Sequence, residues 1–359
     1  MSASASPAVP PSTLDTRHSL LIQDLRTHFF TEEGCIPAVD GVSLSVPRGK
    51  VLAIVGESGC GKSVTSFSIL RLIRRPGRIV GGKILFHPRD GSPAIDIAAL
   101  DEKDDLLYRV RGGYISMIFQ EPMSALSPVH TVGNQICEAI LLHQDVSGEE
   151  ARARAIEMLR KVGIPGAERR IDQYPHELSG GMRQRVVIAM ALVCNPEVLI
   201  ADEPTTALDV TIQAQILKLI KDLQQEQGAS VVFITHDLGV VAQIADEVAV
   251  MYLGKVVERG SVRQVLKNPQ HPYTASLLKS LPGQGKPGER LPAIRGSVPS
   301  LNAIPSGCPF HPRCPEYVPG RCDVGAPPAM RLLEDGREAA CLLRGAGDEG
   351  RVASEETQP

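Results

Sequence analysis

Short apolar runs alternate along the chain with segments whose apolar residues recur at helical spacing. The runs are rich in Val and Ile, and several stop at a polar residue, as buried strands of an α/β sheet do. The predicted strands are residues 20–25, 39–46, 51–55, 81–86, 114–119, 198–201 and 230–235, and residues 248–252 and 255–258 are predicted to form a hairpin. The predicted helices are residues 64–73, 132–142, 149–162, 181–193 and 212–225. This alternation predicts an α/β domain whose ligand lies at the carboxyl ends of its strands.

Changes in composition divide the chain into four parts. Residues 1–17 are rich in Ser, Ala and Pro, and residues 345–359 are polar and acidic, so both are expected to be disordered tails. Residues 18–270 carry the pattern of strands and helices, whereas residues 271–344 are rich in Pro, Gly and Cys. We therefore predict one large α/β domain followed by a small Cys-rich C-terminal extension.

The bulk composition argues against nucleic acid and membrane-spanning classes. The net charge is only −3, there is no Trp, and aromatic residues make up 4%, so neither a basic surface nor a base-stacking surface is indicated. The longest apolar runs, such as residues 186–193, are too short to span a bilayer. The N-terminus lacks the charged and apolar parts of a signal peptide. We expect a cytoplasmic protein that reaches a membrane only through partner proteins.

The most specific motif follows the predicted strand at residues 51–55. Residues 56–63 match G-x-x-x-x-G-K-[ST] in full, and a predicted helix follows, which is the setting in which backbone N–H groups bind phosphate. Lys62 is expected to reach the β- and γ-phosphates, and Ser63 to ligate Mg²⁺. An ordinary Gly-rich turn is the alternative, which a complete match in this setting disfavours. The predicted cradle consists of Gly56, Glu57, Ser58, Gly59, Cys60, Gly61, Lys62 and Ser63.

A pair of acids ends the apolar run at residues 198–201. Asp202 is expected to hold Mg²⁺, directly or through water. Glu203 beside it is then placed to polarise an attacking water. Taken alone, the two acids could equally end a strand before Pro204.

A second glycine motif, Leu-Ser-Gly-Gly at residues 178–181, precedes this acidic strand. Gly180 and Gly181 would let backbone N–H groups approach a phosphate closely, and Ser179 could donate to a γ-phosphate or cap the next helix. A capped helix alone is the alternative. Together with the phosphate loop and the acidic strand, this stretch resembles the signature of the ATP-binding-cassette (ABC) ATPase family. The resemblance covers about residues 20–270, with all motifs in order.

The resemblance implies a P-loop NTPase fold of the ABC type, with a RecA-like α/β core, a β-subdomain and a helical subdomain. In this family two cassettes pack head to tail, and ATP lies between the phosphate loop of one and the Leu-Ser-Gly-Gly segment of the other. The resemblance also implies that Gln120 is a Mg²⁺ and water ligand that senses the transmembrane partner. His236 resembles the switch histidine that contacts the γ-phosphate, with a strand-capping His as the alternative.

Two further segments take their interpretation from the same family. Residues 207–209 resemble the D-loop, and Phe29 resembles the aromatic that stacks on adenine, with Phe30 as the alternative. The implied catalytic residues are Glu203, His236 and Gln120, and the implied Mg²⁺ ligands are Ser63, Gln120 and Asp202. Beyond the phosphate loop, the implied ATP contacts are Phe29, Val64, Gln120, Ser179, Gly180, Gly181, Asp202, Asp209 and His236.

Three stretches, residues 118–128, 178–192 and 268–274, resemble the first of the two ATPase subunits of di- and oligopeptide importers. The resemblance implies that the chain hydrolyses ATP to energise peptide import at the cytoplasmic face of the membrane. The implied partners are a second ABC ATPase subunit, two transmembrane permease subunits and an extracytoplasmic substrate-binding protein. Nickel or another small solute is the alternative cargo. A soluble, non-transport ABC ATPase is disfavoured by the single cassette and the importer-type extension.

Four of the eight cysteines crowd into the extension with the spacing C-x5-C-x7-C-x18-C. This spacing differs from the close C-x2-C pairs of most zinc sites. Four thiolates in loops stiffened by Pro suit a [4Fe–4S] cluster, which members of this importer group with such a segment hold. Zinc, with His311 as a possible ligand, and reduced cysteines in a packed subdomain are the alternatives. The cysteines concerned are Cys308, Cys314, Cys322 and Cys341.

Overall fold

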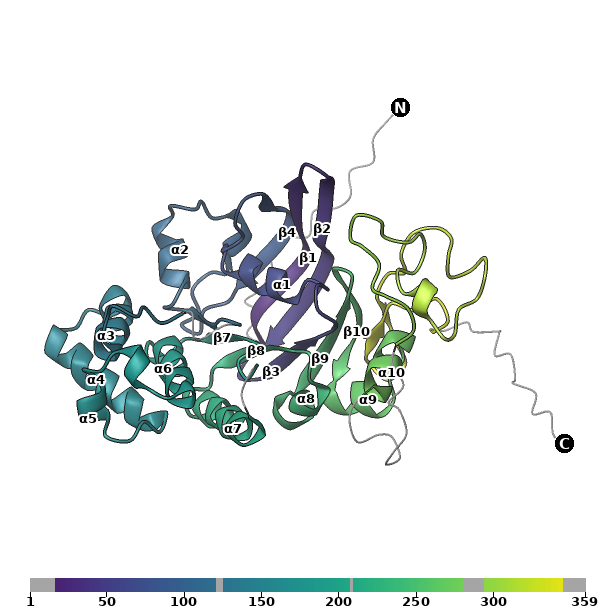
Figure 1. Ribbon diagram of the computed structural model, residues 1–359. Coiled ribbons are helices and arrows are strands. Elements are labelled where there is room, and N and C mark those ends of the chain that lie inside the picture. The colour runs from purple at the N-terminus through teal and green to yellow at the C-terminus, as the bar shows by residue number, and fades with distance from the viewer. Residues whose placement is uncertain (1–16, 121–124, 207–208, 281–293, 345–359) are drawn as a thin grey trace.

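The computed structural model of the protein describes residues 17–120, 125–206, 209–280 and 294–344 (Figure 1). Two β-sheets form its centre. The smaller sheet is antiparallel and has the strand order β2-β1-β4-β5. Its strands are β1 (His18–Thr31), β2 (Gly34–Pro47), β4 (Gly77–Phe86) and β5 (Ile95–Asp96). The prediction for β1 was too short, because its second half places polar residues on an exposed face and carries bulges at which the register shifts.

The larger sheet has the order β11-β12-β10-β9-β3-β8-β7-β6, and its strands from β9 to β6 run parallel. Strands β3 and β7 are buried at every position, as expected for parallel strands that are covered on both faces. The strands are β3 (Val51–Val55), β6 (Ile115–Ile118), β7 (Val198–Asp202), β8 (Ser230–Thr235), β9 (Glu247–Tyr252), β10 (Lys255–Ser261), β11 (Arg331–Leu332) and β12 (Glu338–Ala339).

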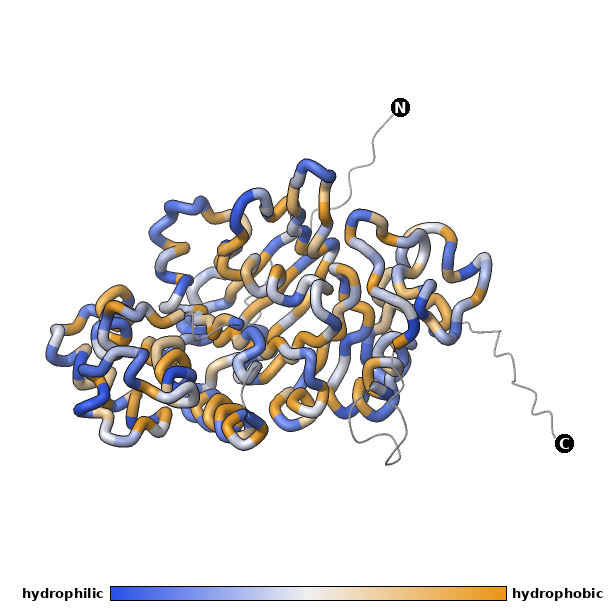
Figure 2. Tube along the Cα trace, viewed as in Figure 1, coloured by the Kyte–Doolittle hydropathy of each residue, from blue (hydrophilic) through white to orange (hydrophobic). Residues whose placement is uncertain are grey.

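Helices lie beside the sheets and form a separate helical layer, which Figure 1 shows on the left, from α3 to α6. The helices are α1 (Lys62–Ile69), α2 (Asp105–Val110), α3 (Val132–His143), α4 (Gly148–Lys161), α5 (Ala167–Arg170), α6 (Gly180–Leu192), α7 (Val210–Gln227), α8 (Leu238–Ile244), α9 (Val262–Lys267) and α10 (Pro272–Lys279). Short 3₁₀ turns occur at Ile97–Ala99, Pro175–Glu177 and His311–Arg313. Hydrophobic residues line the interiors of these layers (Figure 2). No helix of the described ranges is long and apolar enough to cross a membrane.

Helix α1 begins two residues earlier and ends four residues earlier than the predicted helix at residues 64–73. Arg71 takes a left-handed backbone conformation (φ 54°), which ends the helix. Its guanidinium donates to the carbonyl oxygens of Ala98 (2.6 Å) and Leu100 (2.7 Å). These long-range contacts stabilise the end of the helix, which the spacing of apolar residues did not indicate.

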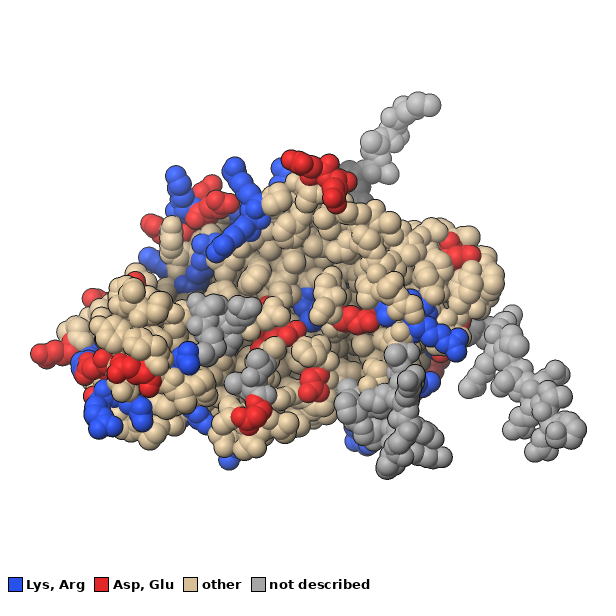
Figure 3. All heavy atoms as spheres, in the orientation of Figure 1, with Lys and Arg blue, Asp and Glu red and all other residues tan. Residues whose placement is uncertain are grey.

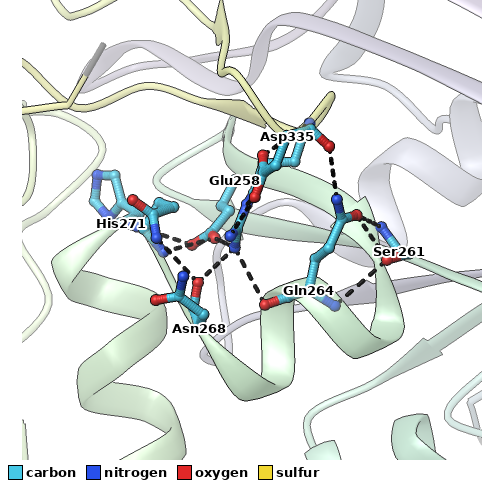
Figure 4. A network of polar contacts seen from close by, with 8 residues as sticks. Glu258, Ser261, Gln264, Asn268, His271 and Asp335 are labelled. Atoms are coloured by element: carbon cyan, nitrogen blue, oxygen red, sulfur yellow. Dashed lines mark hydrogen bonds and ion pairs between the residues drawn. The ribbon is translucent and has the colours of Figure 1, made fainter.

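The C-terminal extension, residues 271–344, is joined to the larger sheet through β12, which pairs with β10. A buried polar network reinforces the joint (Figure 4). The Glu258 carboxylate accepts the backbone N–H groups of Gln270 (2.8 Å) and His271 (2.9 Å). The Arg337 guanidinium lies 3.6 Å from the same carboxylate and donates to the carbonyl oxygens of Gln264 and Asn268. The extension therefore shares its polar core with the end of the cassette.

Candidate active site

The phosphate loop leaves the carboxyl end of β3 and turns into α1 through positions that only glycine can occupy. Gly56 has a φ of +152°, and a Cβ there would lie 2.2 Å from the Met251 carbonyl oxygen. Gly61 has a φ of +100°, and its Cβ would lie 2.4 Å from the Ala38 carbonyl oxygen. The loop therefore passes against neighbouring backbone at both ends, while Gly59 at its tip has open space around it.

The N-terminus of α1 is open toward the loop. Its N-cap residue is Gly61, which offers no side-chain cap, so the first N–H groups of the helix are available to an anion. The buried Lys62 folds back over the loop, and its Nζ donates to the carbonyl oxygens of Gly56 (2.8 Å) and Glu57 (3.0 Å). An ammonium held beside free helix N–H groups is an arrangement that binds phosphate.

Asp202, at the end of β7, lies under the same helix. Its side chain is fully buried, and Ser66 Oγ donates to its Oδ2 at 3.3 Å. A hydrogen bond from Ser63 stabilises the carboxylate as well, but burial is the larger effect and raises the pKa of Asp202. Its Oδ1 has no hydrogen-bond partner among the described residues. A buried, unpartnered carboxylate oxygen next to Ser63 fits a ligand of a divalent cation.

Glu203 and His236 meet where two neighbouring parallel strands end. The backbone N–H of Glu203 donates to the Ile234 carbonyl oxygen at 2.9 Å, which ties the end of β7 to β8. Glu203 Oε1 lies 3.3 Å from His236 Nδ1, and Thr206 Oγ1 donates to Oε2 at 3.0 Å. The Glu203 side chain is 10% exposed and that of His236 is 60% exposed, so the pair opens toward solvent on the histidine side.

Two contacts of this site were not among the predicted residues. Ser66 lies one helical turn after Ser63 on α1, so both hydroxyls face β7, and this spacing is a signal the sequence did contain. Thr206 lies three residues after Glu203 in the turn beyond β7. Nothing in its sequence neighbourhood distinguishes it from a solvent-facing threonine.

Gln120 and Phe29 take no part in the hydrogen bonds described for the other site residues. Gln120 is exposed just beyond β6, the strand that pairs with β7, and makes no hydrogen bond to Lys62, Asp202 or Glu203 in the described structure. Phe29 is half-buried and packs on Gly77, whose Cβ would lie 2.6 Å from the Phe29 ring. The alternative, Phe30, is 40% exposed, and the Arg78 guanidinium lies 4.2 Å from its ring centroid. Their predicted contacts stay predictions.

The Leu-Ser-Gly-Gly segment begins helix α6 rather than lining the phosphate loop of its own chain. Ser179 Oγ accepts the Met182 N–H at 3.4 Å, and Ser179 and Gly180 are exposed. A Cβ on Gly180 would meet no atom within 4 Å, so this backbone has free space in front of it. Asp209 is likewise a helix cap, accepting the Ile212 N–H at 2.9 Å. The D-loop residues Ala207 and Leu208 lie outside the described residues.

The four cysteines of the extension line a single apolar cavity together with His271, His311 and Phe310. None of them forms a disulfide. Burial raises the pKa of Cys308 and Cys341, and that of Cys314 to about 12. Within the described ranges, no group of three or more His, Cys, Asp or Glu side chains is arranged to hold a metal ion. The structure brings the four thiols to one place, but the predicted cluster and the zinc alternative are not confirmed.

Comparison with known proteins agrees with this geometry. A family model described as "ABC transporter" matches residues 39–206. The oligopeptide transport ATP-binding protein AppD of Bacillus subtilis is 49% identical over 325 residues, which cover 90% of this chain and 96% of AppD. The dipeptide transport ATP-binding protein DppD of Escherichia coli is 48% identical over 322 residues, covering 90% and 95%. This chain belongs to the ABC transporter family. A second model, "Oligopeptide/dipeptide transporter, C-terminal region", matches residues 257–322 of this ABC ATPase.

Solved structures confirm the predicted ABC ATPase fold. The ATP-binding cassette MJ0796, in a dimeric post-hydrolysis state bound to ADP and Pi, aligns with a TM-score of 0.59 and 31% identity, covering 68% of this chain and 99% of MJ0796. The structure of cbiO1 from Clostridium perfringens, part of the ABC transporter complex cbiONQ, aligns with a TM-score of 0.58 and 30% identity, covering 70% and 92%. The predicted relationship to di- and oligopeptide importer subunits is also confirmed by the relatives' sequences.

Proposed function

We propose that this ABC ATPase energises the import of dipeptides or oligopeptides. The observation that carries the proposal is the extent of its similarity to AppD and DppD, which includes the C-terminal region at residues 257–322 as well as the cassette. A cassette alone would support ATP hydrolysis without indicating a cargo. Nickel or another small solute remains the alternative cargo.

The phosphate loop binds the nucleotide in this proposal. Lys62 Nζ is held by the Gly56 and Glu57 carbonyl oxygens and directs its remaining N–H toward the β- and γ-phosphates, and the first N–H groups of α1 face the same anion. Ser63 and Asp202 Oδ1, which has no hydrogen-bond partner among the described residues, would hold Mg²⁺, which would supply neutralisation of the phosphate charge. Phe29 stacks on adenine, and Val64 and Gln120 complete the contacts to the nucleotide and its cation.

Glu203 is the proposed general base. Its carboxylate takes a proton from the water that attacks the γ-phosphate, because its Oε1 is directed toward the open side of the site, where His236 lies. The hydroxyl of Thr206 and the imidazole of His236 hold the two carboxylate oxygens at 3.0 and 3.3 Å, so the base enters the reaction already oriented.

A second cassette completes the site. Ser179 caps α6, Gly180 has free space in front of it, and Asp209 caps α7, whose Ile212 would lie 3.7 Å from a Cβ on Gly181, so the starts of the two helices are available to the γ-phosphate bound by a partner. On the face shown in Figure 3, Lys and Arg side chains gather at the upper left, the upper middle is largely uncharged, and acidic side chains are scattered across the middle. We infer a heterodimer with a second ABC ATPase subunit.

The remaining parts of the proposal concern location and the cysteines. The ATPase pair acts at the cytoplasmic face of the membrane on two permease subunits, which receive cargo from an extracytoplasmic binding protein.

A [4Fe–4S] cluster is the proposed ligand of the four cysteines of the extension, Cys308, Cys314, Cys322 and Cys341, with zinc as the alternative. Their common cavity supports this, since four thiols that line one cavity without forming disulfides suit a metal group that stabilises their thiolate forms.

Reconstitution tests the transport proposal. The chain, its partner ATPase, the permeases and the binding protein are placed in proteoliposomes, and uptake of labelled di- and oligopeptides is measured with ATP on the ATPase side. Peptide uptake that depends on ATP, together with peptide-stimulated hydrolysis, is the expected result. Uptake of nickel without uptake of peptides would show that nickel, and not peptide, is the cargo. ATP hydrolysis that no solute stimulates would contradict the importer proposal.

A further inference from the structure

The C-terminal extension reaches back to the phosphate loop through Arg313. This residue lies in the 3₁₀ turn His311–Arg313, next to Cys314. Its Nη1 and Nη2 donate to Glu57 Oε2 (2.7 Å) and Oε1 (3.0 Å), a bidentate ion pair with the second residue of the phosphate loop. The Arg313 side chain is only 4% exposed, so the pair is far more shielded from water than an ordinary surface ion pair.

A second residue of the extension holds the backbone of the same position. The hydroxyl of Tyr273, on α10, accepts the Glu57 N–H at 2.9 Å. The Tyr273 ring is fully buried, with its centroid 4.7 Å from that of Tyr252 and 5.3 Å from that of Phe310. Close aromatic packing leaves the hydroxyl little freedom, so the Glu57 N–H is held by a rigid partner.

Glu57 also contacts the lysine that is proposed to bind phosphate, which connects Arg313 and Tyr273 to the nucleotide site. Its carbonyl oxygen accepts from Lys62 Nζ at 3.0 Å. Glu57 is thus held by the extension through its side chain and its N–H, and it holds the phosphate-binding lysine through its C=O. The next two residues, Ser58 and Gly59, are exposed, and the space around Gly59 is open, so the loop beyond Glu57 has little packing of its own.

The charge of Glu57 matters as well as its position. A carboxylate in a loop that must bind a polyanion opposes the ligand unless a cation neutralises it. The Arg313 guanidinium does this at hydrogen-bonding distance, and the contact raises the pKa of Arg313 further, so it stays charged. Loss of Arg313 would therefore both release the loop and leave an unpaired negative charge beside the phosphates.

We propose that Arg313 and Tyr273 are positioning residues of the ATP site, through which the C-terminal extension holds the phosphate loop in its nucleotide-binding form. Neither residue touches the nucleotide; both act through Glu57. The inference rests on the proposed function only as far as ATP binding and hydrolysis, and it is independent of the transported cargo and of any metal in the extension.

The test compares ATP binding and hydrolysis in the complete ATPase complex carrying Arg313→Gln or Tyr273→Phe. We expect the Kd and the KM for ATP to rise about tenfold in Arg313→Gln and severalfold in Tyr273→Phe, while kcat at saturating ATP stays near the wild-type value. Tyr273→Phe keeps the buried ring and removes only the acceptor, so it keeps the test decisive if Arg313→Gln fails to fold.

A charge rescue separates the effect of the Glu57 charge from the loss of contacts that hold the loop. Glu57→Gln in the Arg313→Gln background removes the unpaired carboxylate and is expected to recover only the part of the ATP affinity that was lost to charge repulsion. The matched control is Arg344→Gln, which removes an Arg of the same extension that pairs with Glu316 instead of the phosphate loop; its KM for ATP should equal that of the wild type. Wild-type ATP affinity in folded Arg313→Gln and Tyr273→Phe, or an equal KM increase in Arg344→Gln, would overturn the inference. Failure of the wild-type complex to bind ATP would instead overturn the proposed function.

Discussion

His236 Nδ1 lies 3.3 Å from Glu203 Oε1, although the two residues follow different strands and precede different helices. The contact arises because β7 and β8 are parallel neighbours whose carboxyl ends meet at one edge of the sheet. Thr206 occupies the other carboxylate oxygen at 3.0 Å. The base is therefore held from two sides before any nucleotide arrives.

Replacement of this base gives the first prediction. Glu203→Gln keeps the shape and can still hydrogen-bond to Thr206 and His236, but the amide cannot accept a proton from water. ATP hydrolysis should fall by about 10²- to 10⁴-fold with nucleotide affinity unchanged. Steady-state phosphate release and equilibrium ATP binding measure the two effects. Glu226→Gln, which removes an exposed carboxylate paired with Lys161, is the matched control and should hydrolyse ATP normally. Near-normal turnover in Glu203→Gln would exclude Glu203 as the base.

Asp202 gives a prediction about the cation. Asp202→Asn keeps an oxygen for the Ser66 hydrogen bond but removes the negative charge of the buried carboxylate, whose Oδ1 has no hydrogen-bond partner among the described residues. The increase in ATP affinity that Mg²⁺ produces should shrink, while ATP binding in the presence of EDTA stays close to the wild type. Titration calorimetry with and without Mg²⁺ measures both. A Mg²⁺ effect of wild-type size in Asp202→Asn would remove Asp202 from the proposed ligand set.

His271 makes the extension sensitive to acid. It is fully buried at the start of α10, where Nδ1 accepts the Tyr273 N–H, and burial lowers the pKa of His271 to about 3. The unfolded chain, with an ordinary His pKa of about 6.5, binds the proton more tightly. Stability from the neutral imidazole is therefore present above about pH 6.5 and is lost as the pH falls toward about 3.

The measurement is the unfolding free energy as a function of pH, compared with His271→Asn. Asn can still cap α10, but it does not titrate in this range, so its stability should depend less steeply on pH between about 6.5 and 3. The variant will start from a lower stability because the imidazole packs on Phe310; the slope is therefore the quantity to compare. Identical slopes in the two proteins would show that His271 does not titrate on unfolding.

The cysteine cavity gives the fourth prediction. Cys314→Ser should abolish the iron, the acid-labile sulfide and the visible absorption of anaerobically purified protein, because one thiolate ligand of four is lost. Cys35→Ser, an exposed cysteine of the smaller sheet, should leave all three unchanged. Wild-type protein that contains zinc and no iron would favour the zinc alternative, and a metal-free, colourless wild type would contradict both.

Much of the active site could be predicted because the residues that bind phosphate are contiguous in the sequence. Residues 56–63 form a loop whose glycines, lysine and serine act within one strand–loop–helix unit, so no distant contact is needed to recognise them. Asp202 and Glu203 were found for the same reason, since an apolar run before two acids marks a buried strand end. Local backbone geometry and local hydrophobic patterning determine these features.

The tertiary structure decided which residues meet across the chain. Ser66, Thr206 and the Glu203–His236 contact depend on the packing of α1, β7 and β8. The four cysteines could be related only by spacing until the loops of the extension brought them to one cavity.

The attachment of Glu57 to Arg313 joins residues 256 positions apart, and Tyr273 adds a contact across 216 positions. Sequence periodicity describes which face of an element is buried, but it does not say what covers that face. Such pairs are therefore determined only when the whole chain packs.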